Sequence, residues 1–93
     1  MEIDFYSLRE ELDEQLKNCD PFFQEKEHRI LVHFYVYYVC QKRLGKGKYN
    51  CRVTPTPKGD IIIDIISKRK RLDPIVITKR KIMRHSKEYD LLD

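Results

Sequence analysis

The chain of 93 residues has no Trp, no Ala and only three Gly, and it lacks both an internal repeat and a linker. Without a linker, and at this length, residues 1–93 are expected to form a single domain. Hydrophobic residues make up 41% of the chain and charged residues 37%, which favours a folded protein over a disordered one. The absence of Ala beside plentiful Ile, Lys and Tyr would suit an AT-rich genome, as in some viruses, and carries no mechanistic argument.

Cysteine is too sparse for two common uses. Cys19, Cys40 and Cys51 include no closely spaced pair, which argues against a zinc site and a secreted disulfide framework, although a Cys40–Cys51 disulfide stays geometrically open. Residues 1–20 are acidic and amphipathic, unlike a signal peptide, and the longest apolar run, residues 30–40, is too short to span a bilayer. We therefore expect an intracellular, cytoplasmic protein, with the nucleus open to it in a eukaryote, and no membrane, metal, cofactor or small-molecule substrate.

Negative charge is abundant in one part of the chain and scarce in the other. Residues 1–40 carry four Lys or Arg against nine Asp or Glu, a net charge of −5. Residues 41–93 carry fifteen against six, a net charge of +9. The densest segment, SKRKRLDPIVITKRK at residues 67–81, holds seven of the nineteen basic residues. A split of this size indicates that the second part faces a polyanion.

Helical periodicity marks the first part of the chain. Apolar residues recur at helical spacing between acidic ones, which predicts a helix over residues 5–18. These apolar residues are Phe5, Leu8, Leu12 and Leu16. RILVHFYVYYVC, residues 29–40, favours a strand by propensity. Asp20-Pro21 before it, Gly45 after it and the lack of a breaker between them instead predict a helix over residues 21–44.

After Gly45 the hydrophobic period changes to two. Strands are predicted over residues 48–54, 60–69 and 75–82, separated by turns at PTPKGD and RLDP and followed by a short polar tail. The short connections favour an antiparallel meander. The predicted fold is therefore α+β: two N-terminal helices packed on one face of a three-stranded antiparallel β-meander. Its helical half, residues 5–44, is acidic, and its β half, residues 45–93, is basic.

Alternation along the strands sorts the side chains onto two faces. The face expected to receive the helices is apolar and consists of Tyr49, Cys51, Val53, Ile61, Ile63, Ile65, Ile75 and Ile77. The opposite face is expected to be basic and consists of Lys48, Asn50, Arg52, Ile62, Asp64, Ile66, Lys68, Lys70, Val76, Thr78, Arg80 and Arg84. There Asp64 can pair with Arg80, and Ile62, Ile66 and Val76 form an apolar patch that the tail or another molecule must cover.

The basic face predicts a small, non-enzymatic nucleic-acid-binding protein. Its side chains are expected to contact phosphates of DNA or RNA largely independently of sequence. The predicted contacts are Arg52, Lys68, Lys70, Arg80 and Arg84, with Lys79 and Lys81 contributing from the strand edge. The alternative is that these cations protect a sheet edge from pairing with other chains. KRKR at residues 68–71 is also similar to a nuclear import signal, a short match that is frequent by chance.

No catalytic constellation stands out. Restriction-type nuclease cores place an Asp at the start of one strand and an acid-x-Lys on the next, and Asp60 and Lys79 are faintly similar to that pattern. Ile77 occupies the second acidic position, and because one carboxylate is a poor magnesium site, the nuclease hypothesis is rejected. His28 and His33 are five residues apart, so they fall on different faces of the predicted helix, and no His pair has metal-ligand spacing.

Two features point to protein partners. The helix predicted over residues 21–44 is apolar on every side, and a two-fold homodimer would cover what one sheet and one helix cannot. Its tyrosines, Tyr35, Tyr37 and Tyr38, are expected in the core or a subunit interface, although such rings also stack on bases. The rival function is an adaptor or inhibitor that docks through the apolar sheet patch and the acidic first helix. The acids of that helix are Glu10, Glu11, Asp13 and Glu14.

Overall fold

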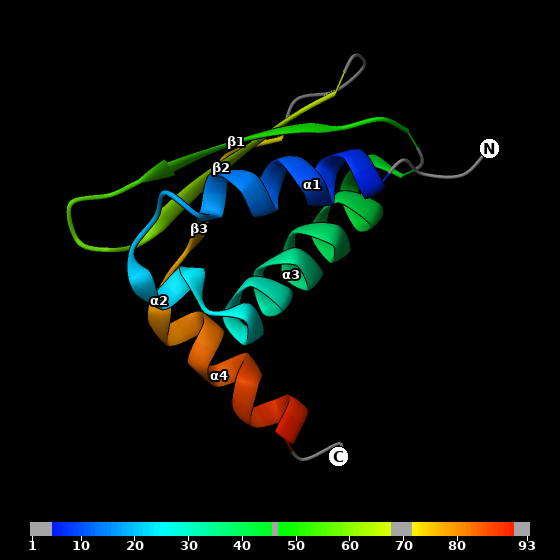
Figure 1. Ribbon diagram of the computed structural model, residues 1–93. Helices are drawn as coiled ribbons and strands as arrows, with labels where there is room; N and C mark the ends of the chain where they lie inside the picture. The colour runs from blue at the N-terminus through cyan, green and yellow to red at the C-terminus, as the bar shows by residue number, and fades with distance from the viewer. Residues whose placement is uncertain (1–4, 46, 68–71, 91–93) are drawn as a thin grey trace.

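The computed structural model describes residues 5–45, 47–67 and 72–90 (Figure 1). The elements follow in the order α1 (Phe5–Leu16), α2 (Pro21–Gln24), α3 (Lys26–Leu44), β1 (Asn50–Pro55), β2 (Ile61–Ile66), β3 (Ile75–Ile77) and α4 (Lys79–Asp90). The strands form one antiparallel sheet in the order β1-β2-β3. The predicted α+β fold is confirmed. None of the described helices combines the length and the apolar character that a membrane span needs.

The hydrophobic core lies between the sheet and the helices. α1 packs against β1, α3 packs against α1, and α2 and α4 pack against α3 (Figure 1). The predicted apolar face of the sheet is buried apart from Val53, which is half-buried. The helices contribute Leu8, Leu12, Leu16, Phe23, Val32, Val36 and Ile82 to the same cluster. Each large aliphatic or aromatic side chain buried here stabilises the fold by about 1.5–3 kcal/mol.

The helix predicted over residues 21–44 is interrupted at Glu25, whose backbone is extended with φ −63 and ψ 135. The Asp20 carboxylate caps α2 by accepting the Phe22 N–H at 2.9 Å, and the Gln24 amide donates to the Cys19 carbonyl at 2.6 Å. His28 then stacks on the Phe22 ring with centroids 4.0 Å apart. These contacts hold α2 as a separate turn of helix. α1 ends at Leu16, two residues before its predicted end.

The third predicted strand is wrong beyond Ile77. β1 and β2 lie close to their predicted bounds, although residues 68–69 of the predicted second strand are outside the described residues. Residues 79–82, predicted as strand, belong to α4, which continues through the predicted tail to Asp90. In the observed register Asp64 lies opposite Arg52, and Ile62 opposite Val76. The predicted Asp64–Arg80 pair is therefore wrong, because Arg80 is on a helix.

The outer edge of β1 is covered by side chains of α1. The Gln15 amide donates to the Cys51 carbonyl at 2.8 Å, and its oxygen accepts the Val53 N–H. Glu11, one turn earlier, accepts the Cys51 N–H at 3.2 Å. These bonds satisfy backbone groups that an edge strand would otherwise offer to another chain.

Candidate nucleic-acid interface

The junction between β3 and α4 determines where the predicted cations lie. Thr78 caps α4: its Oγ1 accepts the Lys81 N–H at 3.1 Å, and its carbonyl accepts the Ile82 N–H at 3.2 Å. Ile82 is fully buried and holds the first turn of α4 against the core. As a result, residues 79–84 are distributed around a helix instead of alternating between the faces of a sheet.

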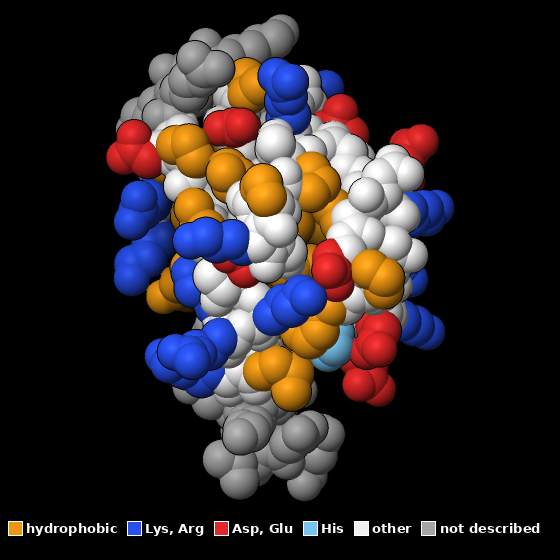
Figure 2. All heavy atoms as spheres, turned by 90° about the vertical axis from the view of Figure 1, so that its left-hand side faces the viewer, with side chains coloured by type: hydrophobic (Ala, Val, Ile, Leu, Met, Phe, Trp, Pro, Cys, Tyr) orange, Lys and Arg blue, Asp and Glu red, His pale blue; other side chains and the backbone are white. Residues whose placement is uncertain are grey.

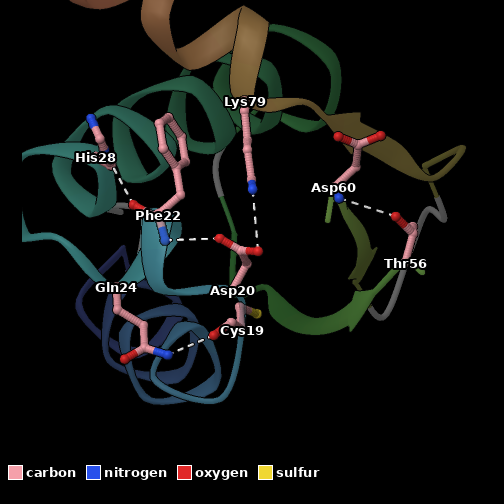
Figure 3. A network of polar contacts seen from close by, with 8 residues as sticks. All are labelled: Cys19, Asp20, Phe22, Gln24, His28, Thr56, Asp60 and Lys79. Carbon is pink, nitrogen blue, oxygen red and sulfur yellow. Dashed lines mark hydrogen bonds and ion pairs between the residues drawn. The ribbon is translucent and has the colours of Figure 1, made fainter. Parts of the chain in front are cut away.

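Lys79 points into a corner of the molecule formed by α2, the β1–β2 turn and the start of α4 (Figure 3). Its ammonium group lies 3.2 Å from the Asp20 carboxylate and 5.8 Å from the centre of the Phe22 ring. The pKa of Asp20 is lowered, first because its carboxylate accepts the Phe22 N–H and then because of Lys79. Gly59 approaches closely enough that a Cβ there would lie 3.3 Å from the Lys79 ammonium. Lys79 is thus engaged within the protein.

Lys81 is engaged in the same way. Its ammonium group donates to the Tyr35 hydroxyl at 3.1 Å and to the Val76 carbonyl at 3.3 Å. It also lies 4.6 Å from the centre of the Tyr35 ring. The contact with Val76 covers a carbonyl of β3, the strand at the other edge of the sheet. For Lys81, the alternative of edge protection therefore has direct structural support.

Arg80 and Arg84 point outward. Both side chains are exposed, they stand one turn apart on α4, and the exposed Met83 lies beside them. We call this pair the arginine face. Figure 2 shows the side of the molecule that carries the β1–β2 turn and the start of α4, with Lys and Arg side chains spread between hydrophobic ones.

The outer face of the sheet is less basic than predicted. Among its described positions, Arg52 is exposed on β1, but it stands directly opposite Asp64. The centre of this face is the predicted apolar patch, with Ile62 half-buried and Ile66 and Val76 exposed. Lys68 and Lys70, together with the rest of KRKR, lie outside the described residues. The structure therefore does not bring the predicted contacts together on one sheet face.

The acids of α1 are partly used inside the protein. Besides Glu11 on the edge of β1, Asp13 lies 3.4 Å from Arg29 and 3.7 Å from His33. Glu10 and Glu14 are exposed. Neither the bond of Glu11 to β1 nor the contacts of Asp13 with Arg29 and His33 were predicted from the sequence. The available signal was position: Glu11 and Gln15 flank the buried Leu12 and Leu16, so they lie at the border of the packed side of the helix.

His28 and His33 lie among structural contacts of the helices. The His28 Nδ1 lies 2.7 Å from the Phe22 carbonyl and 3.3 Å from a Glu25 carboxylate oxygen. His33 lies between α1 and α3, and neither ring nitrogen has a hydrogen-bond partner. The pKa of His33 is lowered because burial disfavours its charged form, an effect that outweighs the attraction of Asp13. No group of three or more His, Cys, Asp or Glu among the described residues could hold a metal ion.

The three cysteines are buried and free. Burial raises the pKa of Cys40 to about 11 and, with the nearby Glu11, that of Cys51 to about 12. Burial also raises the pKa of Cys19. The thiols are therefore neutral near pH 7, and a neutral thiol is a poor nucleophile.

The residues of the rejected nuclease pattern lie near one another at the ends of β2 and β3. The N–H of Asp60, just before β2, donates to the Thr56 hydroxyl at 3.1 Å. Ile77, in the position that a second carboxylate would hold, is opposite Ile61 and fully buried. Lys79 is turned toward Asp20. The absence of enzymatic activity stays a prediction.

Comparison of the chain with protein-family models, curated proteins and solved structures finds no match.

Proposed function

We propose that the protein binds DNA or RNA through the arginine face of α4, largely independently of sequence. The observation that carries the proposal is the division of the cations at residues 79–84. Lys79 and Lys81 have partners within the protein, whereas Arg80 and Arg84 are exposed side by side. Arg is well suited to this role, because its planar guanidinium can hold a phosphate through two parallel hydrogen bonds.

The position of Arg80 supports a role outside folding. It lies in the first turn of α4, which contains no acidic residue. The helix macrodipole favours Asp or Glu in the first turn, so a cation there costs about 0.3–1 kcal/mol. Arg80 also has its side chain exposed, so it contributes little burial in return. A phosphate ligand would offset this cost.

The spacing of the arginine face suits a nucleic-acid backbone. Residues four apart on a helix are separated by about 6 Å of rise. One strand of duplex DNA carries a charge about every 3.4 Å of its axis, so the two arginines are about as far apart as every second phosphate of that strand. Residues 79–90 contain no Asn or Gln, the side chains that read adenine through two hydrogen bonds. Arg52 and, outside the described residues, Lys68 and Lys70 remain predicted as additional phosphate contacts.

The test is the salt dependence of binding by the double variant R80E/R84E. Two fewer phosphate contacts should flatten the plot of log affinity against log salt by about 1.8 for duplex DNA, and by about 1.4 for single strands. Affinity should fall by a similar factor for all sequences. The fold should survive, since both side chains are exposed and Glu at position 80 is favoured by the helix macrodipole.

The matched control is K17E/K26E, which changes the net charge equally at two exposed lysines of the acidic half. It should leave the slope almost unchanged. Equal effects of the two double variants would mean that only net charge matters, and unchanged binding by R80E/R84E would contradict the proposal.

The adaptor hypothesis depends on the acidic helix α1, where Glu10 and Glu14 are exposed, and on the apolar sheet patch, where Ile66 and Val76 are exposed. It predicts that the protein purifies from its host with one protein and without absorbance at 260 nm. The nucleic-acid proposal predicts that such absorbance accompanies the protein until a wash with high salt. A preparation that is free of nucleic acid at low salt would favour the adaptor.

A further inference from the structure

The outward face of α3 is uncharged over most of its length. Between residues 28 and 40, its four exposed side chains are Ile30 at 38%, Phe34 at 57%, Tyr37 at 39% and Tyr38 at 58% exposure. They recur at intervals of four, three and one residues, so they lie on one side of the helix, opposite the buried Val32 and Val36. We call this set the aromatic stripe.

The size of the aromatic stripe sets it apart from scattered exposed residues. A fully exposed aromatic side chain presents about 150–250 Å², so the four exposed fractions together amount to about 400 Å². Contiguous apolar patches of that size on a monomer are often interaction sites. No residue from 30 to 41 is charged, whereas the exposed positions of α1 include Arg9, Glu10 and Glu14.

We infer that a second copy of the chain covers the aromatic stripe, with the two α3 helices packed antiparallel about a two-fold axis. The charges at the two ends of the stripe favour a second copy of α3 and determine whether the two helices run parallel or antiparallel. Glu27 lies in the first turn of α3 and the exposed Lys42 in the last. An antiparallel pair brings each Glu27 to the other copy's Lys42, whereas a parallel pair would oppose like charges. The helix macrodipoles also favour the antiparallel arrangement.

The same pairing fixes the register. If Glu27 meets Lys42, the axis passes between residues 34 and 35. The two Phe34 rings then meet near the axis, and Tyr38 of each copy lies beside Ile30 of the other. The most exposed aromatic rings thus occupy the centre of the interface, where burial contributes most to affinity.

Nucleic acid fits the aromatic stripe less well than a second copy does. A platform for single strands needs cations along the backbone path beside its aromatic rings. Here the exposed cations of α3 beside the stripe stand at its ends: Lys42 at one, 5.5 Å from the centre of the Tyr38 ring, and Lys26 at the other, between the acids Glu25 and Glu27. The arginine face is on another helix.

The area of the aromatic stripe implies a weak dimer. Two stripes bury about 800 Å² together, below the 1,200 Å² or more of stable complexes, so flanking side chains must add to the interface. We therefore expect monomers and dimers to exchange in the micromolar range.

The inference is tested by sedimentation equilibrium on the full chain without nucleic acid, from about 2 to about 200 µM protein. The parent should shift from 11.3 kDa toward twice that mass. The variant Phe34→Glu should stay at 11.3 kDa throughout and keep its helical circular dichroism, since the side chain is exposed. The matched control Met83→Glu, which places the same charge at an exposed apolar position of α4, should dimerise like the parent.

Charge exchange provides the second arm. E27K and K42E should each weaken dimerisation, and the double variant E27K/K42E should restore it. Each single change opposes the helix macrodipole, so the double variant cannot recover by stabilising the helix. A parent that remains at 11.3 kDa throughout, an F34E variant that dimerises like the parent, or a double variant weaker than both singles would overturn the inference. None of these results depends on nucleic-acid binding.

Discussion

α3 and α4 are neighbouring helices with outward faces of opposite chemistry. Each packs its inner side on the core, α3 through Val32, Val36 and Cys40 and α4 through Ile82. Outward, α3 presents the aromatic stripe and α4 the arginine face. Burial in the core explains why the inner side chains of both helices are apolar, but it explains neither the aromatic stripe nor the arginine face. We infer from this difference that the two outer faces bind different partners, an apolar surface for α3 and a polyanion for α4.

The largest effect is expected from loosening α4 at its anchor. Ile82 is the one buried side chain among residues 79–84, so Ile82→Ala removes the apolar hold on the first turns of the helix. The expected loss is about 2–5 kcal/mol in the free energy of unfolding, measured by urea denaturation. If α4 detaches before the rest unfolds, the arginine face loses its fixed orientation while the aromatic stripe is retained.

The control for this prediction is Met83→Ala, at the next position along the helix. Met83 is exposed, so its truncation should change the free energy of unfolding by less than about 1 kcal/mol. Similar losses for the two variants would mean that α4 is not seated through Ile82.

A smaller effect is expected from the cap of α4. Thr78→Ala removes the oxygen that accepts the Lys81 N–H and should cost about 1 kcal/mol. Thr78→Ser keeps that oxygen and should recover most of the loss. In nuclear magnetic resonance, amide exchange at residues 79–82 should accelerate in the Ala variant, with little change at α3. Uniform acceleration across both helices would contradict the separate anchoring of α4.

The smallest effect concerns the inner side of α3. The pKa of His33 is lowered from its ordinary 6.5, first by burial and further by Arg9 and Arg29, with Asp13 acting in the opposite direction. Below pH 6.5 the unfolded chain therefore takes up a proton at this residue that the folded protein resists, and stability falls until the pH passes the lowered pKa. His33→Gln should lose less stability than the parent between pH 7.5 and about pH 5 in urea denaturation. An equal loss in both proteins would assign the pH dependence to other groups.

Periodicity in the sequence predicted the parts of the fold that are set by burial. The alternation of Ile61, Ile63 and Ile65 matches their burial in β2, and α3 ends at Leu44, directly before Gly45, as predicted. The break at Glu25 was not predictable in this way. It depends on contacts such as the stacking of His28 on Phe22, and no Gly or Pro marks it.

The β3–α4 junction differs from the predicted continuous strand for a local reason. Thr78 is a good helix cap, but three cations follow it where a helix start usually carries acids, so the sequence does not predict a helix start there. One signal was available. In a strand, Ile75 and Ile77 point to the same, buried face of the sheet. If the strand continued, Ile82 would point to the opposite, exposed face, yet Ile82 is buried. This error placed Arg80 and Arg84 on the sheet instead of on a separate helix.

Binding of nucleic acid to the arginine face can be tested residue by residue in a nuclear magnetic resonance titration of the protein with a short DNA duplex at low and at moderate salt. If nucleic acid binds the arginine face, the largest amide shifts should occur at residues 80–84, weaken with salt, and be much smaller at residues 30–38. Large shifts along the aromatic stripe with none on α4, or no salt-dependent shifts on α4 with either duplex or single-stranded DNA or RNA, would contradict it.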